Sequence, residues 1–144
     1  MMDLPEQETE QVQDSAPTVV RWQVLQKLDY KNNKIEDESL RAVINKKVRV
    51  PGFAVPLSDN LRSVSDFLLV PNAMACIHVP APPPNLIVFV SLPDPLSIER
   101  LVGPLWIEGI LRIKATQSIY GSSSYEMENV TIEPYNWQTA QDNP

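Results

Sequence analysis

The residues with the clearest chemical potential are the chain's one cysteine and one histidine, Cys76 and His78, which lie two positions apart. Successive residues of an extended strand point to opposite faces, so an extended Cys76-Ile77-His78 would hold the sulfur and the imidazole side by side. Thiolate and imidazole are ligands that zinc and copper accept. The spacing therefore makes Cys76 and His78 candidate ligands of a metal site, for zinc or copper.

A complete metal site needs further ligands, which must be carboxylates or water because the chain has no other cysteine or histidine. Several carboxylates are candidates, and the sequence does not choose between them: Asp59, Asp66, Asp94 and Glu108. Two alternatives stay open. Cys76 and His78 could be a small buried residue and a hydrogen-bonded core imidazole, or the site could be weak or shared between molecules.

The same pair could in principle act as nucleophile and base. That chemistry needs a cysteine and a histidine aligned with each other and with a third polar group. Neighbours two apart on a strand rarely align in this way. The sequence therefore predicts no catalytic residues and no enzymatic activity.

Composition disfavours other functions. The chain has 18 acidic and 12 basic residues, a net charge of −6, and no cluster of Lys and Arg. Neutralising phosphates requires concentrated positive charge, so no nucleic-acid partner is expected. The longest apolar runs, Leu86–Val90 and Phe67–Pro71, are far shorter than the roughly 18–20 residues of a transmembrane helix. No transmembrane segment is predicted.

The 144 residues suit one domain. Residues 1–17 are acidic and nearly free of apolar side chains, which predicts a disordered tail. Residues 18–136 form the predicted domain, and residues 137–144 a flexible C-terminal tail. The first residues lead into Glu- and Gln-rich sequence without the apolar stretch of a signal peptide. One cysteine forms no internal disulfide, so cysteine content does not report the compartment.

The start of the predicted domain reads as a short helical segment. Apolar residues after Thr18 indicate a short element that docks Trp22 on the core. Residues 36–45 read as a short helix, because acidic residues begin it and lysines follow it.

The rest of the chain reads as five short strands. Two of them show a one-residue slip in the apolar alternation, at Pro51-Gly52 and near Asn129, and each slip predicts a β-bulge. Residues 67–70 and 86–90 are continuous apolar runs, as expected of strands buried on both faces or curled into a small barrel. Residues 105–113 alternate cleanly, with Trp106 on the polar phase as a candidate for an interface. Residues 115–124 are polar and indicate a long hairpin loop.

Five strands with bulges, few helices and no βαβ alternation predict a mainly β protein. The expected fold is a small five-stranded antiparallel OB-like barrel with a short N-terminal helical segment. The Pro-rich connection between residues 71 and 85, which carries Cys76 and His78, is expected to pack across one end of the barrel.

Several motifs together resemble the bacterial family catalogued as domain of unknown function 3299. They are residues 48–57 (VRVPGFAVPL), residues 67–71 (FLLVP), the segments CIHVP and PPPN between residues 76 and 85, and residues 105–111 (LWIEGIL). The resemblance covers roughly residues 18–135. Such proteins are commonly exported to the periplasm, and their genes often lie beside ABC-transporter components in zinc-responsive clusters. The family has no established catalytic residues to carry over, and this sequence lacks the usual export signal.

The resemblance implies a non-enzymatic accessory or binding module of the bacterial envelope, periplasmic or envelope-associated, that serves an ABC transporter or another envelope protein and zinc handling. The alternative is a generic protein-interaction or assembly domain without metal. Protection of the Cys76 thiol by zinc would distinguish the two.

Overall fold

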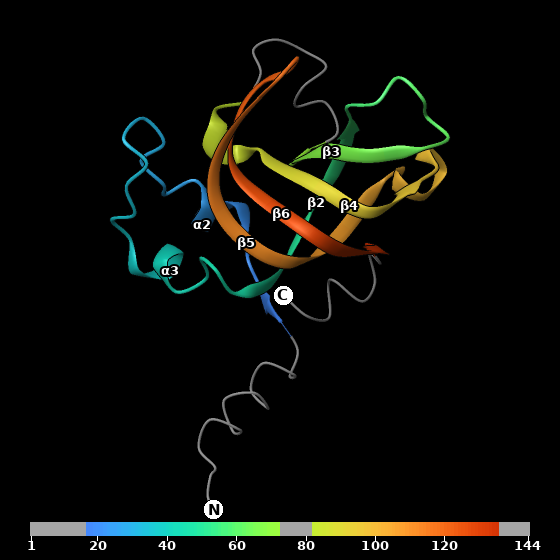
Figure 1. The fold of residues 1–144 in the computed structure, drawn as a ribbon. Helices are drawn as coiled ribbons and strands as arrows, with labels where there is room; N and C mark the ends of the chain where they lie inside the picture. Colours follow the sequence, from blue (N-terminus) through green and yellow to red (C-terminus); the bar gives the residue numbers. More distant parts are fainter. Residues whose placement is uncertain (1–16, 73–81, 136–144) are drawn as a thin grey trace, which may run out of the picture.

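The structure is a computed structural model that describes residues 17–72 and 82–135 (Figure 1). In chain order its elements are β1 (Thr18–Val19), α2 (Trp22–Leu25), α3 (Glu38–Arg41), β2 (Lys47–Pro56), β3 (Val64–Val70), the 3₁₀ turn η1 (Pro84–Leu86), β4 (Val88–Leu96), the 3₁₀ turn η2 (Ile98–Leu101), β5 (Pro104–Ser118) and β6 (Gly121–Pro134). Cys76 and His78 lie outside the described residues, as do residues 1–16 of the predicted N-terminal tail (residues 1–17) and the predicted C-terminal tail at residues 137–144.

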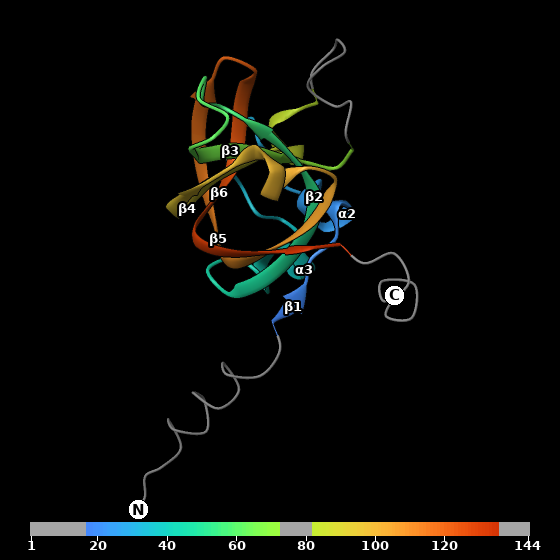
Figure 2. The same ribbon diagram turned by 90° about the vertical axis from the view of Figure 1, so that its right-hand side faces the viewer.

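The strands form one sheet that closes on itself. Its order is β1-β2-β3-β4-β6-β5, and β2 also pairs with β5, so β2 to β6 form a five-stranded barrel. The short α2 and α3 lie together on one side of it (Figures 1 and 2). The predicted mainly β, OB-like five-stranded barrel is confirmed. Among the described residues, none of the helices has the length and apolar character needed to cross a membrane.

One strand pairing differs from the prediction, because β4 and β6 run parallel. The other pairings within the barrel are antiparallel. After β4 the chain crosses to β5, which pairs with β2 instead of with β4. The strand that returns beside β4 is therefore β6, which runs in the same direction as β4. The barrel is mixed, not antiparallel.

The barrel interior is filled by one face of each strand. Phe67 and Leu69 point into this core, whereas Leu68 and Val70 of the same strand join a second apolar cluster with Ile87. The expectation that the continuous apolar run of β3 is buried on both faces is confirmed.

The predicted bulge at Pro51-Gly52 is absent. The register of β2 against β5 is continuous from Lys47–Ile110 to Phe53–Pro104. The apolar residues on either side of Gly52 belong to different faces: Val48 and Val50 fill the barrel, and Phe53 packs on the second cluster. The prediction of a bulge was wrong because both faces of β2 are apolar. The apolar pattern alone could not tell which face a residue belongs to.

The bulge near Asn129 is confirmed. Glu108 pairs with Thr131 and Ile110 pairs with Glu128, which leaves Asn129 and Val130 opposite the single residue Gly109. Asn129 has φ 53°, a left-handed conformation that asparagine tolerates better than most residues.

Two predicted segments have different lengths in the structure. The helix expected over residues 36–45 is only the four residues of α3, capped by Asp37, whose carboxylate accepts from the N–H groups of Ser39 and Leu40. The chain leaves the helix early because the N–H of Asn45 donates to the carbonyl of Leu111 and starts the pairing of β2. The long loop expected over residues 115–124 is instead a hairpin whose strands reach Ser118 and Gly121. In this hairpin Ser122 pairs with Gln117 and Ser123 pairs with Thr116.

Candidate binding surface

The carboxylates proposed as further metal ligands are spread over different elements. Asp59 and Asp94 are exposed, Asp66 lies on β3, and Glu108 lies on β5. Within residues 17–72 and 82–135, no three His, Cys, Asp or Glu side chains lie close enough to hold a metal ion. A site built on Cys76 and His78 therefore stays a prediction from sequence.

The asparagine of the Pro-Pro-Pro-Asn motif ties the N-terminal segment to the barrel. Asn85 is buried, and its Nδ2 donates to the carbonyl oxygens of Gln26 at 2.9 Å and Leu28 at 3.2 Å. The hydroxyl of Tyr125, on β6, donates to the carbonyl of Leu25 at 2.6 Å. Asn85 supplies a donor to two carbonyls just beyond the end of α2, and Tyr125 adds a second donor to the carbonyl of Leu25, which also accepts from the N–H of Leu28 at 3.3 Å. These side chains fix α2 on the barrel.

Tyr125 should make the protein less stable at alkaline pH. Burial raises the pKa of its phenol above the usual value of about 10. At high pH the unfolded state therefore releases a proton that the folded state keeps, so the free energy of unfolding falls as pH rises past about 10. We expect the Tyr125→Phe variant to lose about 1 kcal/mol at pH 7, from the missing hydrogen bond, and to lose less stability than the wild type on going to pH 11. Urea unfolding from pH 7 to pH 11 measures both. Parallel pH profiles would contradict the assignment.

The fixed position of α2 creates a recess in the surface, which we call the aromatic hollow. Its volume is about 310 Å³, and it is lined by Trp22, Pro51, Gly52, Phe53, Pro71, Pro104 and Tyr135. The indole N–H of Trp22 donates to the carbonyl of Pro51 at 2.6 Å, which holds this ring in the wall. Aromatic rings and prolines present flat apolar surfaces with few internal degrees of freedom. The walls of the hollow therefore have few rotamers to lose when a partner binds.

Next to the hollow, Tyr135 stacks on Trp106, with ring centroids 5.1 Å apart and an interplanar angle of 25°. The guanidinium of Arg49 lies over the Trp106 ring, 4.6 Å from its centroid. The strand register explains both contacts of Trp106. Trp106 pairs with Pro51 on β2 and with Glu133 on β6. Arg49 and Tyr135 are each two residues from one of these partners, on the same face. Trp106 therefore faces outward, as its place on the polar phase of β5 indicated.

Beyond Trp106, on the side away from the hollow, the surface carries a row of ion pairs. Glu133 accepts from Arg49 at 2.8 Å, and Glu108 lies 3.7 Å from Arg49 Nε and 3.5 Å from Lys47 Nζ. We call Lys47, Arg49, Glu108 and Glu133 the ion-pair strip. Its two positive and two negative charges balance. Glu108, once a candidate metal ligand, is engaged by two cations here.

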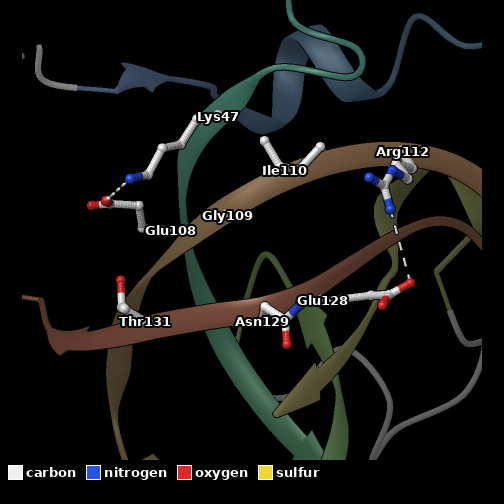
Figure 3. Close-up of a pocket in the computed structure, with 8 residues that line it drawn as sticks. All are labelled: Lys47, Glu108, Gly109, Ile110, Arg112, Glu128, Asn129 and Thr131. Atoms are coloured by element: carbon white, nitrogen blue, oxygen red, sulfur yellow. Dashed lines mark ion pairs between the residues drawn. The ribbon is translucent and has the colours of Figure 1, made fainter. Parts of the chain in front are cut away.

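A second hollow lies at the far end of the strip, over the β6 bulge (Figure 3). It has a volume of about 340 Å³ and is lined by Lys47, Glu108, Gly109, Ile110, Arg112, Glu128, Asn129 and Thr131. Arg112 and Glu128 form a loose ion pair at 3.9 Å across it. Exposed ion pairs of this kind contribute little to stability. This hollow is lined mostly by polar and charged residues whose charges balance, so it offers less to an apolar partner than the aromatic hollow does.

Sequence reasoning singled out two residues of this surface, Trp22 and Trp106, and did not single out the others. It singled out Trp22 as a core residue, and Trp22 does pack on the core while also forming a wall of the hollow. It missed Arg49, Phe53 and Tyr135, which come from distant parts of the chain. Only their alignment in the register brings them together, and no local pattern reports that alignment.

Fold and surface together define an OB-like barrel module with an aromatic recess between its N-terminal segment and the ends of its strands. The model of the family described as protein of unknown function (DUF3299) matches residues 3–134, and the chain belongs to this family. The crystal structure of a DUF3299 family protein from Pseudomonas aeruginosa is similar, with a TM-score of 0.69 and 26% sequence identity, over 85% of this chain and 99% of that chain. Among curated proteins, none matches this sequence.

Proposed function

We propose that this protein is a non-enzymatic binding module that docks a segment of a partner protein in the aromatic hollow. The observation that carries the proposal is the hollow itself, an apolar recess of about 310 Å³ with aromatic and proline walls. Recesses lined by Trp and Tyr supply large contact areas at a small entropic cost, and such residues dominate the energy of protein interfaces.

The preferred partner is a component of the bacterial envelope, and the favoured role is that of an accessory to an ABC transporter in the periplasm or at the envelope. This role is the one that the resemblance noted from the sequence implies, with export and genes beside transporter components. The alternative is an interaction or assembly module with no link to transport or metal. Both versions use the aromatic hollow.

The hollow is tested by mapping where peptides bind. In the full-length chain, a panel of proline-rich and leucine-rich decapeptides is titrated while the amide signals of Gly52 and Phe53 and the indole signal of Trp22 are followed by NMR. We expect at least one peptide to shift these signals. The Tyr135→Ala variant should bind it about tenfold more weakly, because Tyr135 forms one wall and contributes little to the barrel core.

Ile119→Ala is the matched control, because Ile119 is 83% exposed at the β5–β6 turn, away from the hollow. It should bind as the wild type does. Peptide shifts confined to other surfaces, or equal affinity in the Tyr135→Ala variant, would overturn the proposal.

Zinc handling is a separate part of the proposed role, and it depends on the Cys76-x-His78 motif. We expect the 144-residue chain, purified without a chelator or a His tag, to bind zinc that the Cys76→Ser and His78→Ala variants each fail to hold. Affinity should weaken as pH falls, because the ligands are a thiolate and a neutral imidazole. Metal analysis beside melting curves measures this. A wild type without zinc, together with destabilised variants, would assign both side chains to packing.

A further inference from the structure

The second hollow, over the bulge of β6, contains two ion pairs that are too long to be hydrogen bonds. Lys47 Nζ lies 3.5 Å from the carboxylate of Glu108, and Arg112 Nη1 lies 3.9 Å from that of Glu128, whereas an N–H···O hydrogen bond is about 2.7–3.2 Å long. The two pairs lie on either side of Ile110 (Figure 3). Within residues 17–72 and 82–135, none of the four charged side chains makes a hydrogen bond, so all four keep their full capacity to bind a polar ligand.

The bulge adds two neutral polar groups to this hollow. Glu108 pairs with Thr131 and Ile110 pairs with Glu128, so two β5 residues that are two positions apart face β6 residues that are three apart. Asn129 is the exposed residue in the widened space. The side chains of Asn129 and Thr131 form no hydrogen bond in the described part of the chain. An amide and a hydroxyl each supply both a donor and an acceptor.

These groups favour a ligand that is polar but uncharged. The two positive and two negative charges of the lining cancel, so the hollow does not select an ion by its charge. It presents ammonium and guanidinium donors directly beside carboxylate acceptors. A hydroxyl group can accept from a cation and donate to a carboxylate at the same time, and hydrogen bonds to charged groups are stronger than those between neutral groups. Exposed ion pairs contribute little to stability, so little is lost when a hydroxyl comes between their partners.

We propose that the second hollow binds a neutral saccharide. Hydroxyl groups of the sugar bridge the two ion pairs, Asn129 and Thr131 bond to further hydroxyls, and the C–H face of the ring packs on Ile110. The volume of about 340 Å³ lies in the range of roughly 300–1,000 Å³ that is usual for small-molecule sites. The second hollow shares no lining residue with the aromatic hollow, so this inference does not depend on peptide docking there.

The test titrates the 144-residue chain with glucose, galactose, mannose, N-acetylglucosamine, cellobiose and chitobiose while the amide signals of Ile110, Asn129 and Thr131 are followed by NMR. Concentrations up to about 50 mM are needed, because a site this exposed should bind in the millimolar range. We expect at least one saccharide to shift these signals. Its affinity should change by less than about twofold with added NaCl, because the ligand carries no charge.

Two variants test the neutral polar groups. Asn129→Gly removes the amide and tolerates the left-handed backbone, and Thr131→Val removes the hydroxyl at nearly constant volume. Each should weaken saccharide binding about fivefold to tenfold. Asn33→Gly is the matched control, because Asn33 is also exposed with a left-handed φ of 55° but lies outside the hollow. It should bind as the wild type does, and so should Tyr135→Ala.

Three results would overturn the proposal. One is that no saccharide of the panel shifts the three amide signals. Another is that both Asn129→Gly and Thr131→Val bind the saccharide with wild-type affinity. The third is that free glycine, citrate or putrescine shifts the same signals at lower concentration than every saccharide does, which would assign the hollow to a zwitterion, an anion or a cation. None of these results bears on the aromatic hollow.

Discussion

The Gly52→Ala variant is expected to unfold with a free energy about 3 kcal/mol below that of the wild type. A β-carbon at position 52 would lie 2.7 Å from the carbonyl oxygen of Val70 and 3.0 Å from the side chain of Leu69. The carbonyl is part of the β3 backbone and cannot rotate away as a side chain can. The barrel must shift locally, and this cost exceeds the roughly 0.4–1 kcal/mol that alanine gains by restricting the unfolded chain.

The matched control is Gly109→Ala, in β5. Its nearest contact would be a methyl carbon of Val130 at 3.0 Å, a side-chain atom that can move. Chemical denaturation should therefore show a smaller loss for Gly109→Ala than for Gly52→Ala. Because Gly52 also lines the aromatic hollow, the Gly52→Ala variant should bind docked peptides less well even where it is folded. A loss of stability under 1 kcal/mol for Gly52→Ala would contradict the close approach of β2 and β3.

The second large effect is expected at Asn85. Replacing it by alanine removes the donor to two carbonyl oxygens, those of Gln26 and Leu28, and leaves unfilled space in a buried place. We expect a loss of about 2–4 kcal/mol. In the Asn85→Ala variant, hydrogen exchange should speed up more at the amides of α2 than at those of the barrel strands, because Asn85 holds this segment in place. Urea unfolding and hydrogen exchange measure the two effects.

The Asn85→Asp variant sharpens the test. A carboxylate would face two carbonyl oxygens with no proton to donate, so the folded state raises the pKa of this aspartate above its unfolded value of about 3.9. The variant should therefore become less stable, relative to the wild type, as pH rises from 3 to 7. Asn32→Ala is the control, because the amide of Asn32 bonds only to the nearby Asp29 in an exposed turn. A similar small loss in both alanine variants would show that Asn85 is not an anchor.

The barrel was predictable because several strands have a local sequence pattern that is typical of a strand. The alternation over residues 105–113 and the slip at Asn129 both follow from the two-residue period of a strand. The false bulge at Pro51-Gly52 shows the limit of that reasoning. Phe53 is apolar because it packs on a second cluster outside the barrel, and the sequence alone does not separate two apolar faces. The direction of β6 beside β4 depends on which strands meet across the barrel, which no local pattern contains.

The candidate site was less predictable for the same reason. The polar phase of β5 pointed to Trp106 as a surface residue, but its contacts with Arg49 and Tyr135 depend on pairing between strands far apart in the chain. The role of Asn85 was visible in the sequence only as part of a family motif. Its partners, Gln26 and Leu28, could be found only in the folded structure. Cys76 and His78 remain the part of the site that rests on the sequence alone.

The position of β6 in the sheet has a consequence for how the molecule assembles during synthesis. This strand is the last of the barrel to leave the ribosome, yet it lies between β4 and β5 and pairs with both. Until it is made, β5, β2, β3 and β4 can form only an open sheet, whose exposed edges at β4 and β5 can pair with another chain. Closure through β6 also joins segments distant in sequence, such as Val88 with Tyr125, a topology that folds slowly. Nascent chains that stall before residue 121 should therefore be the species most prone to aggregate.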